Sequence, residues 1–230
     1  MNKKTIIVLL LTFIVAFTAN AQVRSFNIGI TPAIGMDNIN IKHWQLESES
    51  FEREYKMHYN TITGINAQFE TVFDNSVFFL GELSYSSAKF DEYEVEDGST
   101  MPLVQNMMED INVYSAGAMI GIRNGARIQF PIGIGPSVDY VSGTPFKHLF
   151  LSLNAEVRIK FYLTRVIAVY GGIRGKAGYS FGNTGENNMR KKRNEEDSSE
   201  NSSHLCNMDL HFFRAMAYPQ IGITFTLGGE

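Results

Sequence analysis

The sequence lacks several features that would place it in common protein classes. It has one cysteine, Cys206, in 230 residues, which excludes an internal disulfide framework and a multi-cysteine zinc site. Its net charge of −4 gives no reason to expect a nucleic-acid partner. Charged residues make up 19% of the chain, below the ~25% typical of soluble domains. The mature chain has no long segment of helical periodicity, and its many glycines and aromatic residues argue against disorder and against a coiled coil.

Residues 1–21 are typical of a secretory signal peptide. Lys3 and Lys4 precede an apolar run over residues 5–17, and Ala19-Asn20-Ala21 supplies a small-x-small cleavage pattern. As a helix this run would span only about 20 Å at ~1.5 Å per residue, too short to cross a ~30 Å hydrocarbon core. We therefore predict cleavage after Ala21 and a single exported domain over residues 22–230.

The rest of the chain alternates with a period of two. Side chains on a strand point to opposite faces in turn, so this pattern predicts strands with one apolar and one polar face. The segment 149–163 is clearest, because its odd positions are all apolar: Leu149, Leu151, Leu153, Ala155, Val157, Ile159, Phe161 and Leu163. Similar stripes predict eight strands in all. A change of parity upstream of Tyr114 predicts a β-bulge near Val113.

The connections between these strands alternate between short and long. Short turns are predicted at residues 74–76, at Asn124-Gly125 and at Thr164-Arg165, and longer connections at 37–58, 91–109, 142–147 and 181–206. This arrangement is typical of an eight-stranded antiparallel up-and-down transmembrane β-barrel with two unlike ends.

The alternation alone does not say which face meets lipid, because a soluble lipocalin-like barrel with a small apolar ligand shows the same pattern. In that alternative Leu151, Leu153, Val157 and Ile159 would line the cavity. The signal peptide and the length of the apolar stripes favour lipid. So do aromatic residues at both ends of the stripes, which resemble interfacial girdles: Phe73, Phe79, Phe130, Phe161 and Phe225 near the short turns, and Tyr59, Tyr85, Tyr114, Tyr140, Tyr179 and Phe213 near the long connections.

The last strand carries a further signal. Residues Gln220–Leu227 resemble the β-signal that the barrel-assembly machinery reads in outer-membrane proteins, although Gly228-Gly229-Glu230 follow it. Together with Ala-Asn-Ala-Gln at 19–22 and the eight predicted strands, it resembles the outer-membrane β-barrel domain family called PorT-like or "porin family". The resemblance implies a barrel in the outer membrane of Gram-negative bacteria and, for some members, a link to type IX protein secretion.

The interior of such a barrel has room only for its own side chains. Charges there must pair, since burying an unpaired charge is costly. A turn centred on residue 165 would place Glu156 opposite Arg174 and Asn154 opposite Lys176. We predict a closed ion-pair network that includes Glu70, Glu82, Arg123, Asp139, Glu156, Arg158, Lys160, Arg174, Lys176 and Arg214. A narrow ion or proton path is the alternative use of these charges.

Catalytic and metal sites are poorly supported. His148, Ser152 and Glu156 share a strand face, but residues four apart on a strand lie ~13 Å apart, too far for direct proton transfer. We interpret His148 as a rim residue. His43 and His58 form a weak metal pair, and Glu92, Glu94 and Glu96 an acidic solvated edge. We expect no enzyme activity, no metal and no cofactor.

The long connections carry the remaining candidate contacts. Trp44, Phe51 and Tyr55 lie in the first, and an apolar odd-position pattern through Met57 and Tyr59 continues into the following strand, which predicts a hairpin projecting beyond the membrane. Arg190, Lys191, Lys192 and Arg193 lie in the last. They are candidates for contact with a protein partner, outer-membrane lipid or lipopolysaccharide. The sequence predicts a non-enzymatic barrel with a plugged, charged lumen, acting through its loops or in envelope integrity, with an accessory role in secretion as the alternative.

Overall fold

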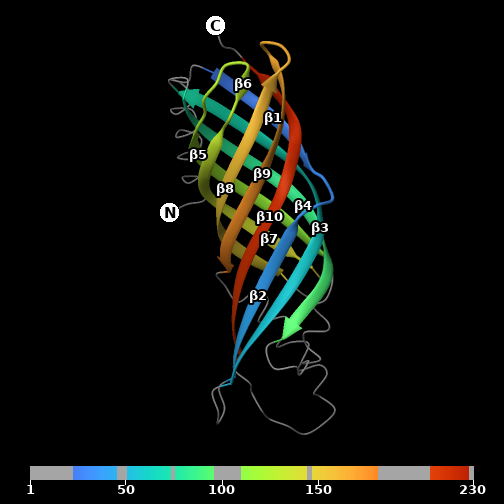
Figure 1. Ribbon diagram of the computed structural model, residues 1–230. Helices are drawn as coiled ribbons and strands as arrows, with labels where there is room; N and C mark the ends of the chain where they lie inside the picture. The colour runs from blue at the N-terminus through green and yellow to red at the C-terminus, as the bar shows by residue number, and fades with distance from the viewer. Residues whose placement is uncertain are drawn as a thin grey trace.

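The structure is a computed structural model that describes residues 23–45, 51–73, 76–95, 110–143, 147–180 and 208–227. It forms a single antiparallel sheet wrapped into a tall barrel (Figure 1). No helix within these ranges is long and apolar enough to cross a bilayer. The predicted signal peptide lies outside the described residues. The strands, in chain order, are β1 (Val23–Thr31), β2 (Met36–Gln45), β3 (Phe51–Phe73), β4 (Val77–Val95), β5 (Ile111–Ile122), β6 (Ile128–Gln129), β7 (Ile132–Ser142), β8 (Lys147–Tyr162), β9 (Ile167–Ser180) and β10 (Met208–Thr226).

Two pairs of these segments are each one barrel strand with a short break. β1 and β2 both lie between β3 and β10, and they follow one another along these neighbours. The break between them contains Pro32, which has no amide hydrogen to give to the ladder. Pro131 separates β6 from β7 in the same way, and both segments pair with β8. The ten segments therefore make the eight strands that the sequence predicts.

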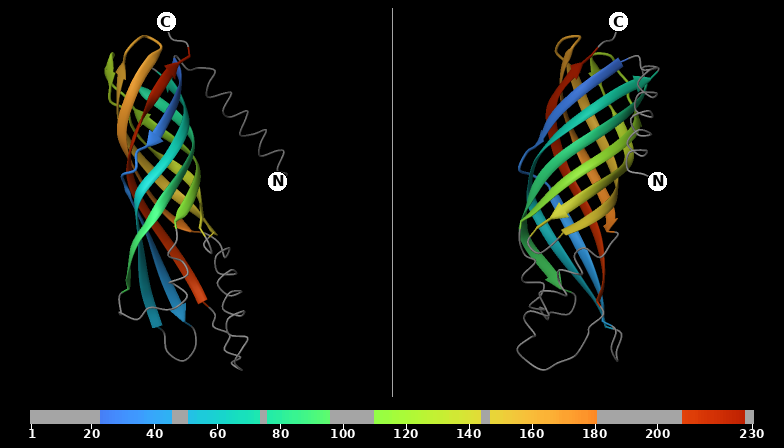
Figure 2. Two further views of the ribbon diagram at one scale, coloured as in Figure 1. Left: turned by 90° about the vertical axis from the view of Figure 1, so that its right-hand side faces the viewer. Right: turned by 180° about the vertical axis from the view of Figure 1, so that it is seen from behind.

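The pairing closes into a ring. Stepping from partner to partner around the sheet returns to the starting strand, through Ile28, Ala67, Leu83, Ala116, Val138, Leu151, Tyr179, Phe213 and Asn40. The path begins on β1 and ends on β2, farther along the same barrel strand. Such a stagger is the mark of strands tilted against the barrel axis, and the tilt is plain in Figure 2.

The two ends of the barrel differ. The turns at residues 123–127 and 163–166 lie at one end, together with the end of β3 and the start of β4, where short turns are predicted (Figure 1). At the other end β2, β3, β4 and β10 run on past the ends of β7, β8 and β9 (Figure 1). The predicted long connections at 37–58 and 91–109 are wrong in extent, because β2 continues to Gln45, β3 begins at Phe51 and β4 continues to Val95. We name this extension of the four strands the projecting sheet.

The apolar stripes face outward along most of the barrel. Leu151, Leu153, Val157 and Ile159 on β8 are between 52% and 55% exposed, while the residues between them are buried. The soluble alternative, in which these four side chains line a cavity, is therefore wrong. The polar stripe is the interior face.

Tyrosines form part of a girdle on the outer face. Tyr114 is flanked by Tyr85 and Tyr140 on the neighbouring strands, with ring centroids 5.1 Å and 6.4 Å away, and Tyr179 pairs with Phe213. The prediction for Tyr59 is wrong, since this side chain is 2% exposed and lies inside. Near the short turns Phe130, Phe161 and Phe225 are exposed as expected.

The predicted bulge near Val113 is also wrong, because β5 pairs with β4 without a register shift. The irregularity lies instead on β3, where the register shifts between His58 and Ile62. Thr61 within it has a φ of 49°, an uncommon backbone conformation for a non-glycine residue. Beyond this bulge the faces of β3 exchange, so that Met57 and Tyr59 point inward although Ile65 and Ala67 point outward.

Candidate functional site

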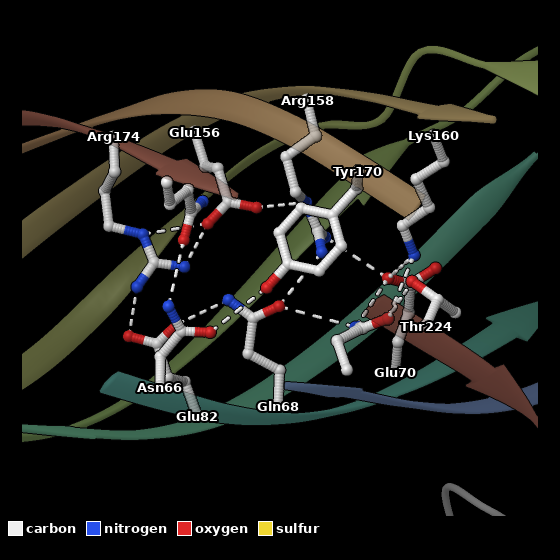
Figure 3. A network of polar contacts seen from close by, with 12 residues as sticks. Asn66, Gln68, Glu70, Glu82, Glu156, Arg158, Lys160, Tyr170, Arg174 and Thr224 are labelled. Atoms are coloured by element: carbon white, nitrogen blue, oxygen red, sulfur yellow. Dashed lines mark hydrogen bonds and ion pairs between the residues drawn. The ribbon is translucent and has the colours of Figure 1, made fainter. Parts of the chain in front are cut away.

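The barrel interior holds a chain of ion pairs, part of which Figure 3 shows. Nearest the short turns, Lys160 Nζ donates a hydrogen bond of 2.6 Å to Glu70 Oε2. Arg158 donates to the same carboxylate oxygen at 3.2 Å and to Gln68 Oε1 at 3.0 Å. Its guanidinium also lies 5.6 Å from the ring centroid of Tyr170. Glu70 thus receives two cations from β8, on the far side of the interior.

The next level is built around Arg174. Its Nε donates to Glu156 Oε2 at 2.8 Å, and its terminal nitrogens contact Glu82 and Glu156. Arg158 Nε also contacts Glu156, which joins the two levels. β8 and β9 pair Glu156 with Arg174 and Asn154 with Lys176, the register predicted from a turn centred on residue 165. Gln68 Nε2 completes the level by donating to Glu82 Oε2 at 2.6 Å.

Two further ion pairs lie toward the projecting sheet. Lys176 Nζ contacts Asp139 Oδ1 at 3.1 Å, and Ser152 Oγ donates to the other oxygen of Asp139 at 2.6 Å. Arg214 Nε donates to both carboxylate oxygens of Asp37, at 2.8 Å and 3.0 Å, and Arg214 Nη2 contacts Asp37 Oδ2. Sequence reasoning missed Asp37 because it placed residue 37 in a loop.

The interior charges nearly balance. Every predicted network residue lies inside and is at most 7% exposed. The described interior carries five carboxylates and six cations: Asp37, Glu70, Glu82, Asp139 and Glu156, against Arg123, Arg158, Lys160, Arg174, Lys176 and Arg214. Arg123 stands apart near the short turns, where its Nη1 donates to Gln129 Oε1 at 3.1 Å. Close pairing of this kind offsets the cost of removing each charge from water.

Apolar clusters lie at both ends of this polar zone. The smaller one, near the short turns, consists of Val72, Phe78, Leu80 and Met119. The larger one occupies the end toward the projecting sheet, and we name it the apolar cap: Ile39, Met57, Tyr59, Ile62, Ala88, Ile111, Val113, Val141, Phe150, Phe212, Met216 and Tyr218, with Phe90 against it. Sequence reasoning listed only the charges of the interior face and missed these residues, although several share its parity.

The polarity of the wall is reversed around the apolar cap. The outer face there carries Lys56, Asn60, Lys89 and Glu92, all exposed, while the inner face packs apolar side chains. Tyr59 lies inside, edge-on to Phe90 at 5.8 Å between ring centroids. Burial raises the pKa of the Tyr59 phenol, with Asp37 adding to the effect. The wall around the apolar cap therefore has the polarity of a water-soluble barrel.

The candidate catalytic residues do not assemble as a triad. Ser152 contacts Asp139, whereas His148 Nδ1 lies 3.3 Å from Ser180 Oγ on β9. His148 lies at the start of β8, near the rim, but it is 1% exposed, and its ring centroid lies 3.9 Å from that of Phe212 with the planes tilted by 41°. The described residues contain no group of three or more His, Cys, Asp or Glu arranged to hold a metal.

The candidate loop contacts are placed only in part. Trp44, Phe51 and Tyr55 lie in β2 and β3, near the tip of the projecting sheet, but their side chains lie outside the described part. His58 bonds Asn38 Oδ1 at 2.9 Å and is 3.9 Å from Glu94, while His43 belongs to β2. Glu96, Cys206 and the basic run Arg190, Lys191, Lys192 and Arg193 lie outside the described residues.

The fold was compared with those of solved structures. The outer-membrane protein OprG of Pseudomonas aeruginosa matches with a TM-score of 0.52 at 8% identity, over 91% of this chain and 98% of OprG. The chain has the fold of a small outer-membrane β-barrel. The outer-membrane protein AlkL (TM-score 0.45, 6% identity, 90% and 91% covered) and the outer-membrane protease OmpT of Escherichia coli (0.44, 8%, 90% and 98%) match less well. The assignment rests on OprG and on the strand pairing. No protein-family model and no curated protein matches the sequence.

Proposed function

We propose that this protein is a non-enzymatic β-barrel of the Gram-negative outer membrane with a plugged lumen, exported by the signal peptide at residues 1–21. It acts through the surface beyond the membrane or in the integrity of the envelope. The observation that carries the proposal is the order of the charged and apolar zones along the inside of the barrel. Charged side chains are paired between the short turns and the apolar cap, which lies on the side of the projecting sheet.

The paired charges and the apolar cap argue against a water-filled pore. An aqueous channel needs a wide barrel of about 16 strands, whereas eight strands enclose a space that side chains can fill. Ions crossing the interior would have to break contacts such as Glu70 with Lys160 and then pass the apolar cap. The outer face between the girdles is apolar and matches a bilayer, because charged residues there would be costly.

Two measurements test the proposal. Fractionation of the envelope, with a heat-dependent shift on an SDS gel, should find a folded barrel in the outer membrane. Purified protein in planar bilayers should show no open channel, even when Lys160→Ala and Glu70→Ala remove the pair together, because the apolar cap still closes the interior. Steady conductance by the unaltered protein would refute the plugged lumen, and a periplasmic protein with no heat shift would refute the location.

A second candidate is an accessory role in protein secretion, as the PorT-like resemblance implies. The polar outer face around the apolar cap supports it, since it offers a surface beyond the girdle on which a partner protein can dock. A deletion strain should then lose secreted proteins from the medium while its outer membrane keeps its permeability. Loss of the permeability barrier with normal secretion would instead favour the envelope role.

A further inference from the structure

An apolar groove runs along the outer face of the barrel, across β1, β3 and β4. It has a volume of about 460 Å³. Its cause is one small residue, because Ala67 on β3 pairs with Ile28 on β1 and Leu83 on β4. The two longer side chains rise on either side and are 49% and 67% exposed, so the alanine between them leaves a hollow. Ile30 and Tyr85 line the groove toward the projecting sheet.

The groove lies within the band that faces lipid and is continuous with it. Tyr85 belongs to the tyrosine girdle beside Tyr114, so the groove opens below the girdle toward the membrane interior. An elongated apolar chain that lies along it makes more van der Waals contacts than it would make with a flat wall. In a bilayer the occupant with that shape is a lipid acyl chain.

The chemistry above the groove suggests which lipid supplies the chain. On the same two strands, past Tyr85, the outer face presents Thr63 opposite Ser87 and then Asn60 opposite Lys89. Thr63, Asn60 and Lys89 are exposed. Lys89 lies four residues beyond Tyr85, about 13 Å along the strand at ~3.3 Å per residue. The carboxylates of Glu92 and Glu94 lie farther out, and Glu94 is beside His58.

We propose that this groove binds one acyl chain of lipopolysaccharide, whose phosphate is held by Lys89 with Thr63 and Ser87 as hydrogen-bonding neighbours. The assignment to lipopolysaccharide rests on the proposed outer-membrane location, because the long-loop end of such barrels faces outward and lipopolysaccharide forms that leaflet. A phosphate beside an ammonium group gains a charge-assisted hydrogen bond. The site would fix one lipid at one place on the barrel.

The test is native mass spectrometry of the full-length protein in nanodiscs that contain both lipopolysaccharide and phospholipid. Ala67→Leu fills the groove without adding charge, and its matched control is Ala155→Leu, an exposed position on β8 away from the groove. We expect Ala67→Leu to lower lipopolysaccharide occupancy about tenfold, the effect of losing roughly ten carbon–carbon contacts at ~0.1–0.2 kcal/mol each. Ala155→Leu should stay within about twofold of the unaltered protein.

The headgroup is tested independently. Lys89→Gln should lower lipopolysaccharide occupancy about three- to fivefold and leave phospholipid unchanged, whereas Lys56→Gln, farther out on β3, should change neither. Equal occupancy in the Ala67→Leu and unaltered proteins would overturn the site. Loss of both lipids in Ala67→Leu with no effect of Lys89→Gln would overturn the assignment to lipopolysaccharide. The heat-dependent gel shift of each variant shows independently whether the barrel is folded. Failure of the proposed outer-membrane barrel is therefore seen on the gel, and failure of the lipid site is seen in the lipid occupancy.

Discussion

Breaking the Asp37–Arg214 ion pair tests whether the interior is dry. Both side chains are at most 2% exposed, and Arg214 holds the carboxylate through two of its nitrogens. Removing one partner of a buried pair leaves the other charge without compensation, which costs about 3–5 kcal/mol. We therefore expect Asp37→Leu and Arg214→Met, each alone, to lower the free energy of unfolding by about that amount. The loss for Arg214→Met is expected at the upper end of this range, because this change also removes the 3.9 Å contact between Arg214 Nη1 and Asp139 Oδ2.

The double variant should recover most of this loss. Arg214 pairs with Ile39 and Asp37 with Met216 in the register of β2 and β10, and both partners belong to the apolar cap. Leucine and methionine would therefore extend an existing apolar surface. Replacement of a buried pair by packed apolar residues is often neutral or stabilising. The coupling energy between the two changes should therefore be about 3 kcal/mol or more.

Urea unfolding of the reconstituted barrel, followed by the heat-dependent gel shift, measures these free energies. Glu94→Gln is the matched control, because this carboxylate is 64% exposed beside His58, and its loss should cost at most about 0.5 kcal/mol. The reasoning is refuted if each single variant costs less than about 1 kcal/mol and the two effects add. That result would mean that water solvates the pair, and the proposal of a plugged lumen would lose its support.

Three further predictions follow from the wall and its two ends. Gly121→Ala should destabilise the barrel by about 1–3 kcal/mol in the same unfolding assay, because the added carbon would collide with the β7 backbone; Gly81→Ala, which meets nothing within 4 Å, should be near neutral. Leu153→Arg, on the lipid face, should cost about 2–4 kcal/mol, whereas Asn60→Arg on the polar outer face should cost little in parallel unfolding curves. Burial raises the pKa of Tyr59, so stability should fall as pH rises above ~10, where only the unfolded phenol ionises. A pH titration of Tyr59→Phe should show a smaller fall, and an unchanged fall would contradict the assignment.

The two faces of the wall could be predicted from the sequence because alternation along a strand is a local property. The seven apolar residues at odd positions from Leu149 to Phe161 fix the outer face of β8, and the turn at residue 165 then fixes its register with β9. That register pairs Glu156 with Arg174. Contacts across the interior could not be predicted in this way. The pairs of Glu70 with Lys160 and of Asp37 with Arg214 join strands that are distant in the chain, and they depend on the closure of the ring.

The apolar cap escaped prediction for a different reason, which is visible on β3. Its odd positions are apolar at Met57 and Tyr59 and again at Ile65, Ala67 and Phe69, so the apolar positions keep one parity on both sides of Thr61 and Thr63. Two reversals cancel on this strand: the bulge at Thr61 exchanges the faces of the strand, and at the same level the environment outside changes from lipid to water. An apolar side chain that faces lipid below the bulge becomes an apolar side chain that faces the interior above it.

On β5 the environment outside the barrel changes without a bulge in the strand. The strand has no register shift, so Ile111 and Val113 keep the same inward face as Ser115, and the change of parity in the sequence records the change of environment alone. A parity change in a strand of this kind therefore has two physical origins, a bulge or a membrane boundary, and sequence alternation reports only their combination. The neighbours on β4 separate them here, because Tyr85 and Tyr114 pair at the girdle, where the outer surface begins to turn polar.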